Sequence, residues 1–154
     1  MIANCDIGLA RRADAEWIAS LSRDAIEDGL DWTWTPGRVL RSVANPATNT
    51  IIARERDRRL GFAIMTYGDA DAHLLLLAVD SARRRQGIGS ALLAWLELTA
   101  RTAGISRIRA EVRAGNGAAR AFYRRQGFEQ ARVLHGYYQG VDDAMVLAKR
   151  VGAA

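Results

Sequence analysis

The sequence predicts an α/β protein of the α+β type, with a mixed, mostly antiparallel sheet of about seven strands and about four helices. Three observations predict this fold. Hydrophobic residues change between a period of two and a period near 3.6 in the order βααβββαβαββ. A strand–helix–strand run in the middle of the chain requires a parallel crossover within the sheet. The chain has 154 residues, 49% hydrophobic and 25% charged, so a single domain over residues 1–154 is expected.

The first elements are a strand and a helix. Residues 5–11 are expected to form the strand. Asp14 can cap a helix that runs to about Asp28. One stripe of this helix is apolar and is expected to face the core; it comprises Trp17, Ile18, Leu21 and Ala25.

A second, shorter helix and a hairpin follow. Thr35–Pro36 is a capping residue followed by proline at the first helical position. Leu40 and Val43 are expected to face inward from this helix. Residues 50–54 and 60–67 are rich in β-forming side chains and flank a charged turn, so they predict a hairpin.

The centre of the chain predicts a buried strand, a long helix and another strand. Residues 73–79 are apolar without alternation, as in a central strand covered on both faces. The helix starts near Gly87 and stops at Gly104, a typical glycine end. Residues 107–113 alternate as a strand. The inward positions of the helix are Ile88, Leu92, Leu93, Leu96 and Ala100.

The last helix is capped by Asn116 and ends at Gly127. Its periodicity turns Phe122 toward the core and places Tyr123 about a quarter turn round, in a half-buried position. Two final strands are expected at residues 128–138 and 144–151.

Composition excludes several classes of protein. The longest apolar run, residues 74–79, is far shorter than the ~18 residues needed to span a membrane. The lone Cys5 cannot pair within the chain and suits a reducing cytoplasm, so a cytoplasmic location is expected. Two histidines and one cysteine are too few for a zinc site, so no metal is expected.

Charge is unevenly distributed along the chain. Residues 1–80 carry a balance of −3 and residues 81–154 a balance of +8, which together give the net charge of +5. The second half therefore favours an anionic partner, either nucleic acid or a phosphorylated cofactor. Nucleic acid is disfavoured because stacking aromatic residues are scarce there: residues 81–120 contain Trp95 alone.

The sharpest local signal is a candidate phosphate loop. Arg84, Gly87 and Gly89 form the pattern R-x-x-G-x-G at the start of the long helix. Glycine lets the backbone approach a ligand, and a helix N-terminus presents unpaired N–H groups that suit a pyrophosphate. The alternative is a glycine turn beside a solvated arginine cluster.

Glu111 and Tyr123 each allow two interpretations. Glu111 shares one strand face with Arg109 and Arg113, so it is either salt-bridged between them or a base that takes a proton from a substrate ammonium. Tyr123 is either a half-buried amphipathic residue or a proton donor. The residues alone leave both open.

Three segments together resemble a known family. RRRQGIGSALL, EVRAGNGAARAFYRRQGF and the closing GYYQGVDDAMVL are similar to the GCN5-related N-acetyltransferase (GNAT) superfamily, over residues 60–149. Within the superfamily, EVRAGN followed by YY and DDA is most similar to ribosomal-protein alanine N-acetyltransferases, which modify the N-terminal amine of a protein.

The resemblance implies acetyl-CoA as cosubstrate, a GNAT-like fold and direct transfer without a covalent enzyme intermediate. It implies that Tyr123 is the general acid and Glu111 the general base, acting directly or through water. It implies contacts between Asn116 and the cofactor arm. Strand residues Leu77, Ala78 and Val79 would pair with the pantetheine arm, and Arg84, Arg85, Gln86, Gly87, Ile88, Gly89 and Ser90 would form the pyrophosphate loop.

The acceptor side is less well defined. Residues 57–151 correspond to the acetyl-CoA-binding and catalytic core, and residues 1–56 to acceptor-side elements. Trp32 and Trp34 are either core anchors or neighbours of the acceptor amine. Tyr137 and Tyr138 point to opposite sides of a strand, so one can line the acceptor groove. His73 is expected to be an ordinary strand residue.

Three functions are compatible with this sequence. The first is acetylation of a peptide or protein N-terminus. The second is acetylation of a small amine such as a polyamine, an amino acid or an antibiotic. The third is a non-catalytic acyl-CoA-binding module. Acetyl-CoA and an amine acceptor are the expected partners, with no nucleic acid or membrane, and the chain is expected to be a monomer or a homodimer.

Overall fold

The computed structural model of the protein describes residues 5–84 and 86–152. They form one seven-stranded sheet in the order β1-β2-β3-β4-β5-β7-β6. Neighbouring strands are antiparallel except for β4 and β5, which are parallel. The predicted element order and crossover are confirmed. The strands are β1 (Asp6–Leu9), β2 (Thr48–Glu55), β3 (Arg58–Tyr67), β4 (Asp71–Val79), β5 (Arg107–Arg113), β6 (Glu129–Tyr138) and β7 (Asp142–Arg150).

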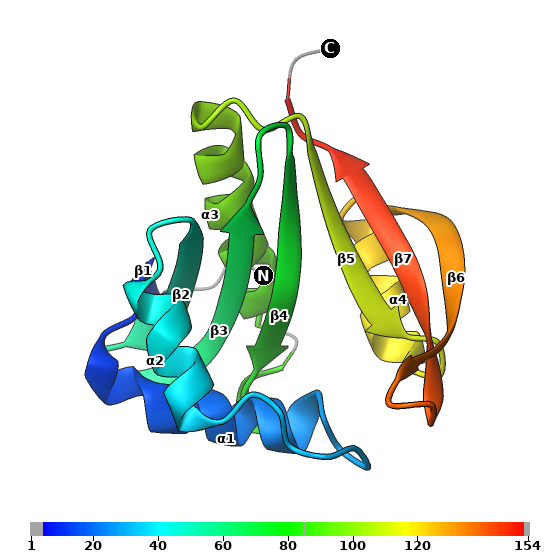
Figure 1. Cartoon of the computed structure of the whole chain (residues 1–154). Coiled ribbons are helices and arrows are strands. Elements are labelled where there is room, and N and C mark those ends of the chain that lie inside the picture. Colours follow the sequence, from blue (N-terminus) through cyan, green and yellow to red (C-terminus); the bar gives the residue numbers. More distant parts are fainter. Residues whose placement is uncertain (1–4, 85, 153–154) are drawn as a thin grey trace.

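Two pairs of helices cover the two faces of the sheet (Figure 1). α1 (Ala15–Ala25) and α2 (Pro36–Ala44) lie on one face, and α3 (Ile88–Thr102) and α4 (Gly117–Arg125) on the other. Each face has its own apolar core. The core under α1 and α2 contains Ile18, Val39 and Phe62, and the core under α3 and α4 contains Met65, Leu92, Leu96 and Tyr123. No helix in the described part of the chain is long and apolar enough to cross a membrane.

Helix α2 begins where the sequence predicts and packs differently. The Thr35 hydroxyl accepts a hydrogen bond from the backbone N–H of Arg38 at 3.4 Å, and Pro36 occupies the first helical turn. The fully buried side chain is Val39. Leu40 and Val43, predicted as the inward residues, are only partly buried against the core. The inward stripe is therefore centred on Val39, because the helix is rotated to seat this residue on the sheet.

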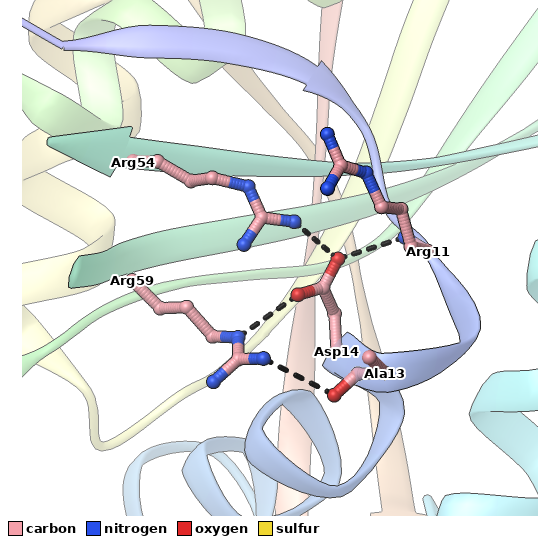
Figure 2. Close-up of polar contacts among 5 residues, drawn as sticks. All are labelled: Arg11, Ala13, Asp14, Arg54 and Arg59. Carbon is pink, nitrogen blue, oxygen red and sulfur yellow. Dashed lines mark hydrogen bonds and ion pairs between the residues drawn. The ribbon is translucent and has the colours of Figure 1, made fainter. Parts of the chain in front are cut away.

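Asp14 precedes α1 as predicted, but its carboxylate does not cap that helix. It accepts a hydrogen bond from the backbone N–H of Arg11 at 2.7 Å and pairs with Arg54 and, at 2.9 Å, with Arg59 (Figure 2). The side chain is 1% exposed. Burial alone would raise the pKa of Asp14, but the hydrogen bonds from Arg54, Arg11 and Arg59 outweigh it and lower the pKa. This ion cluster fixes the start of α1 to the β2–β3 hairpin.

A bulge in β4 moves its side chains from one face to the other. Met65 of β3 pairs with Leu74 and Ile64 pairs with Leu76, so Leu75 is passed over in the ladder. Leu74 consequently faces the core under α3, whereas Leu76, two residues later, faces the core under α1 and α2. The strand is covered on both faces as predicted, and the bulge marks the place where β4 turns away from β5.

Candidate active site

A cavity opens where β4 and β5 part. The parallel ladder between them ends at Leu74 and Ala110, and the strands then diverge toward their carboxyl ends (Figure 1). A cavity of about 970 Å³ lies there. It is lined mainly by residues 74–79 of β4, 87–90 at the start of α3, 111–113 of β5 and 116, 118, 119, 121–123 and 125 around α4. Ligands of α/β sheets commonly bind at the carboxyl ends of parallel strands.

The predicted phosphate loop lies in this cavity. Gly87 has a φ of +80°, in the left-handed region that favours glycine, and it turns the chain into α3. The first N–H groups of α3 lack partners within the helix and carry its positive dipole end. Gln86 is half-buried outside the cavity lining, and Arg85 lies outside the described residues. The loop residues that line the cavity are Arg84, Gly87, Ile88, Gly89 and Ser90, joined by Arg83.

One edge of β4 borders the same cavity. Leu77, Ala78 and Val79 pair with β3 on one side, whereas the ladder with β5 has already ended at Leu74. Their other edge can therefore offer backbone N–H and C=O groups to a ligand that runs along the strand. A strand edge, a helix N-terminus and nearby arginines together fit the amide-rich arm and the pyrophosphate of coenzyme A.

Asn116 lies at the start of α4, on the border of the cavity. Its Oδ1 accepts a hydrogen bond from the backbone N–H of Ala119 at 3.0 Å, so the residue caps α4 as predicted. Asn116 also lines the cavity. Because the carbonyl oxygen is used by the cap, the side-chain amide is the group of Asn116 that can donate to a ligand arm.

Tyr123 lies on the cavity wall with its ring inside the core. It is 6% exposed, and its ring packs edge-on against Phe122 and Phe128 with centroid separations of 5.2 Å. The prediction that Phe122 is the inward residue and Tyr123 the half-buried one was wrong: Phe122 is half-buried, against Gly89 of α3. Burial, and then the proximity of Tyr138, raises the pKa of Tyr123 above its usual value of 10. The hydroxyl therefore keeps its proton at neutral pH.

Glu111 also lines the cavity, but its partner differs from the expected one. Arg109 and Arg113 share its strand face as predicted, yet among the described residues Glu111 pairs with neither arginine. Its Oε2 is instead hydrogen-bonded to Nε2 of His73 on β4. Arg113 donates from Nε to Oδ2 of Asp142 at 3.1 Å. His73 was expected to be an ordinary strand residue, and the parallel pairing of β4 with β5 brings it to Glu111.

The two tryptophans anchor the loop between α1 and α2. Trp34 is 9% exposed, and the Arg38 guanidinium lies 3.8 Å from its ring centroid. Trp32 donates from Nε1 to the carbonyl of Ala19 at 3.2 Å. Neither side chain lines the cavity. Sequence reasoning missed Glu27, whose buried carboxylate accepts hydrogen bonds from the backbone N–H groups of Thr33 and Trp34 and organises this loop.

Tyr137 and Tyr138 were expected to face opposite sides of the strand, but their rings pack edge-on against each other with centroids 5.0 Å apart. Tyr138 lines the cavity, and Tyr137 is 48% exposed beside it. Burial, followed by the proximity of Tyr137 and Glu111, raises the pKa of Tyr138. Of the four predicted acceptor-side residues, Tyr138 is therefore the one at the cavity.

Hydrogen bonds join the loop after α1 to the hairpin between β6 and β7, next to Tyr138. Gln139 accepts a hydrogen bond from the backbone N–H of Asp31 at 2.8 Å and donates one to its carbonyl at 3.1 Å. Arg113 also donates to the carbonyl of Asp28. The loop after α1 and the β6–β7 hairpin are thus linked across 108 residues of sequence. Within residues 5–84 and 86–152, no group of three or more His, Cys, Asp or Glu side chains could hold a metal ion.

The family follows from comparison with known sequences. The model of the acetyltransferase (GNAT) family matches residues 13–128, a span that contains the phosphate loop, Glu111 and Tyr123. The chain belongs to the GNAT family. The resemblance predicted from three motifs is therefore confirmed, and the GNAT-like fold with it.

Individual relatives of this GNAT chain include an alanine N-acetyltransferase and an N-alpha-acetyltransferase. A [ribosomal protein bS18]-alanine N-acetyltransferase of Salmonella typhimurium is 39% identical over 95 residues, which are 60% of this chain and 64% of the relative. The N-alpha-acetyltransferase RimI of Mycobacterium tuberculosis is 33% identical over 137 residues, 86% of this chain and 84% of the relative. The chain spans less than two thirds of the Salmonella relative's length.

Solved structures share the fold over nearly the whole chain. The ribosomal-protein-S18-alanine N-acetyltransferase of Escherichia coli is 26% identical with a TM-score of 0.84, covering 97% of this GNAT chain and 96% of that one. Arabidopsis thaliana NAA60 in complex with acetyl-CoA is 19% identical, also with a TM-score of 0.84, and covers 96% and 99%. The second likeness is one of fold alone.

Proposed function

We propose that this GNAT chain is an acetyl-CoA-dependent N-acetyltransferase that moves an acetyl group directly to a primary amine, the N-terminal α-amine of a peptide or protein. The observation that carries the proposal is that the candidate phosphate loop, Glu111 and Tyr123 line one cavity. The names of the Salmonella and Mycobacterium relatives support the choice of acceptor.

The residues present fit coenzyme A. Gly87, Gly89 and the N–H groups at the start of α3 would hold the pyrophosphate, with positive charge from Arg83 and Arg84. The free edge of β4 at residues 77–79 would hold the arm. When bound, acetyl-CoA supplies an acetyl group activated as a thioester.

Two side chains would move the protons. Glu111 accepts one proton from the acceptor ammonium, directly or through a water, and leaves a neutral amine as nucleophile. The amine would attack the thioester carbonyl and form the C–N bond, and as the C–S bond breaks Tyr123 Oη would deliver its proton to the leaving thiolate. The second proton that the nitrogen loses on becoming an amide would restore the Tyr123 hydroxyl through water. The raised pKa of Tyr123 keeps that proton in place until the thiolate forms. Because tyrosine is a weaker acid than a thiol, this delivery depends on placement at the cavity wall.

The chemistry of amines also favours an α-amine acceptor. An α-amine with a pKa of 7.7–8.0 is roughly 10–20% neutral at pH 7, whereas a lysine side chain is about 0.04% neutral. The ratio is about 300-fold, or roughly 3.4 kcal/mol. The α-amine therefore needs much less help from Glu111 than a lysine would.

The experiment is a competition between matched peptides. One peptide has a free N-terminus and blocked lysines, and the other has a blocked N-terminus and free lysines. Release of CoA is measured, and mass spectrometry locates the acetyl group. We expect the free N-terminus to be acetylated and Glu111→Gln to lose most turnover, with the largest deficit at low pH where the amine is mostly protonated.

Other outcomes assign other functions. Preferred acetylation of the lysine peptide would overturn the α-amine acceptor. Turnover of a polyamine, an amino acid or an antibiotic with neither peptide modified would place the chain among small-molecule acetyltransferases. Binding of acetyl-CoA without turnover of any amine would make it a binding module.

A further inference from the structure

His73 holds Glu111 at the boundary between two hollows of the molecule. Nε2 of His73 is hydrogen-bonded to Oε2 of Glu111, and the two side chains are 19% and 12% exposed. Glu111 lines the large cavity. His73 lines a second hollow of about 290 Å³, together with Tyr67, Asp71 and Arg109. The imidazole therefore contacts the carboxylate from the side away from the phosphate loop.

Two arginines share the strand face of Glu111, and one of them is free to replace His73 as its partner. Arg109 and Arg113 lie two residues before and after it on the same face of β5. A carboxylate bound by a guanidinium is held in its ionised form and is a weaker base. Arg113 is occupied, because it donates to Asp142 and to the carbonyl of Asp28. Arg109 has no carboxylate partner among the described residues.

We propose that His73 is a positioning residue for acetyl transfer. Its Nε2–H donates to Oε2 of Glu111, fixes the plane of the carboxylate and prevents it from turning to Arg109. Oε1 is then left to take the proton from the acceptor amine, since an ionised carboxylate accepts at both oxygens. This inference rests on the proposed function, in which Glu111 is the base.

Charged and titratable groups surround the pair on every neighbouring strand. Arg109 pairs in register with His73, and Tyr137 and Tyr138 interact electrostatically with Glu111. A substitution of His73 removes its hydrogen bond to Glu111 and leaves the other charged and titratable groups around the pair in place. These groups are Tyr67 of β3, Asp71 of β4, Arg109 and Arg113 of β5, Tyr137 and Tyr138 of β6 and Asp142 of β7.

The kinetic test compares two substitutions with a matched control. His73→Phe keeps a ring of similar size without a donor, and His73→Gln restores an N–H donor. We expect His73→Phe to lower kcat on the order of 10- to 100-fold with unchanged acetyl-CoA affinity, and His73→Gln to recover part of it. The pH profile of kcat/KM should also change in His73→Phe, because Arg109 then takes the place of the histidine beside Glu111. The control is His135→Gln, which removes an exposed histidine hydrogen-bonded to Asp143 at 3.3 Å.

A spectroscopic test separates this inference from the proposed function. The chain has two histidines, so the ring nitrogens of both can be followed by NMR without substrate. Glu111→Gln should shift the signals of His73 and leave those of His135 unchanged. Unshifted His73 signals would overturn the contact, whether or not any amine is acetylated.

The kinetic outcomes are equally distinct. If the wild-type chain transfers acetyl groups while both His73 variants keep its kcat and pH profile, His73 has no positioning role and the proposed function stands. If the wild-type chain acetylates no amine, the proposed function fails and the NMR result alone decides whether His73 holds Glu111. Circular dichroism checks folding, and His73→Gln carries the test should His73→Phe not fold.

Discussion

Gly89 of α3 lies so close to Phe122 of α4 that a Cβ added to it would be 3.2 Å from Cε1 of the ring. This approach brings the start of α3, which carries the candidate phosphate loop, against the helix that carries Tyr123. The half-buried ring of Phe122 thus acts as a spacer between the two. The glycine in the motif therefore allows the two helices to pack closely, in addition to the access to a phosphate that we propose for it.

Gly89→Asp should weaken acetyl-CoA binding at least tenfold, or about 1.4 kcal/mol. It adds a negative charge where a pyrophosphate would meet the positive end of a helix. Gly89→Ala adds volume against Phe122 without charge. The difference in acetyl-CoA affinity between the two variants therefore measures the electrostatic part of the loss. Calorimetric titration with acetyl-CoA gives the affinities. Gly8→Asp, at a glycine with open space around it, is the charge control. Equal affinity of folded Gly89→Asp and wild type would place the pyrophosphate elsewhere.

Tyr123→Phe should lower turnover on the order of 10²- to 10⁴-fold, because it removes the donor that protonates the leaving thiolate. The ring stays, and with it the edge-on packing against Phe122 and Phe128. Acetyl-CoA affinity should therefore change little. Steady-state kinetics on the acetylated peptide and calorimetry report the two quantities, and retention of near-normal kcat would show that Tyr123 is not the acid.

Tyr123→Phe should also make the free energy of unfolding fall less steeply as the pH rises in the alkaline range. The pKa of Tyr123 is higher in the folded protein than in the unfolded chain, so the folded state keeps a proton that the unfolded state releases. Its stabilisation is complete below about pH 10 and falls above it, by up to about 1.4 kcal/mol per pH unit. Urea unfolding of wild type and Tyr123→Phe between about pH 8 and pH 11 checks this. Parallel profiles would contradict the burial of the hydroxyl.

Asp14→Asn should destabilise the fold by about 3 kcal/mol, because it leaves Arg54 and Arg59 without their shared carboxylate. The lowered pKa of Asp14 means that its stabilisation is present at neutral pH and is lost as pH falls through its folded-state pKa. The variant should therefore lose less stability in acid than wild type. Urea unfolding at neutral and acid pH measures both effects. Asp24→Asn, in the exposed pair with Arg23, is the control, with an expected change of less than about 1 kcal/mol.

Features set by nearest neighbours in sequence were predictable. The Thr35–Pro36 start of α2, the Gly87 turn into α3 and the Asn116 cap of α4 depend on local backbone chemistry, and each forms where expected. The motif spacing that identified the family depends on the same kind of information. Asp14 is a partial exception, because its position was predicted but its carboxylate is drawn away by two arginines about 40 residues distant.

Features set by strand register were not predictable. The run LLLLAV places similar side chains on both faces, so nothing in it reveals that the ladder passes over Leu75. The contact of His73 with Glu111 joins residues 38 apart through a parallel pairing that no local pattern specifies. Helical periodicity also could not rank Phe122 and Tyr123, since the outcome depends on the space that Gly89 leaves on another helix. The cytoplasmic location, the boundary between residues 1–56 and 57–151 and the state as monomer or homodimer stay predictions.

The parallel ladder between β4 and β5 is four residue pairs long, from Asp71 with Arg107 to Leu74 with Ala110. In the strand order it is the seam between two half-sheets, one of four strands and one of three. So short a ladder provides few backbone hydrogen bonds between the two half-sheets at the point where the ligand would enter. An arm of coenzyme A seated along β4 would lengthen the seam by completing the edge with its own amides. The free energy of cosubstrate binding would then also hold the half-sheets together, and amide hydrogens of residues 75–79 should exchange more slowly once the cosubstrate is bound.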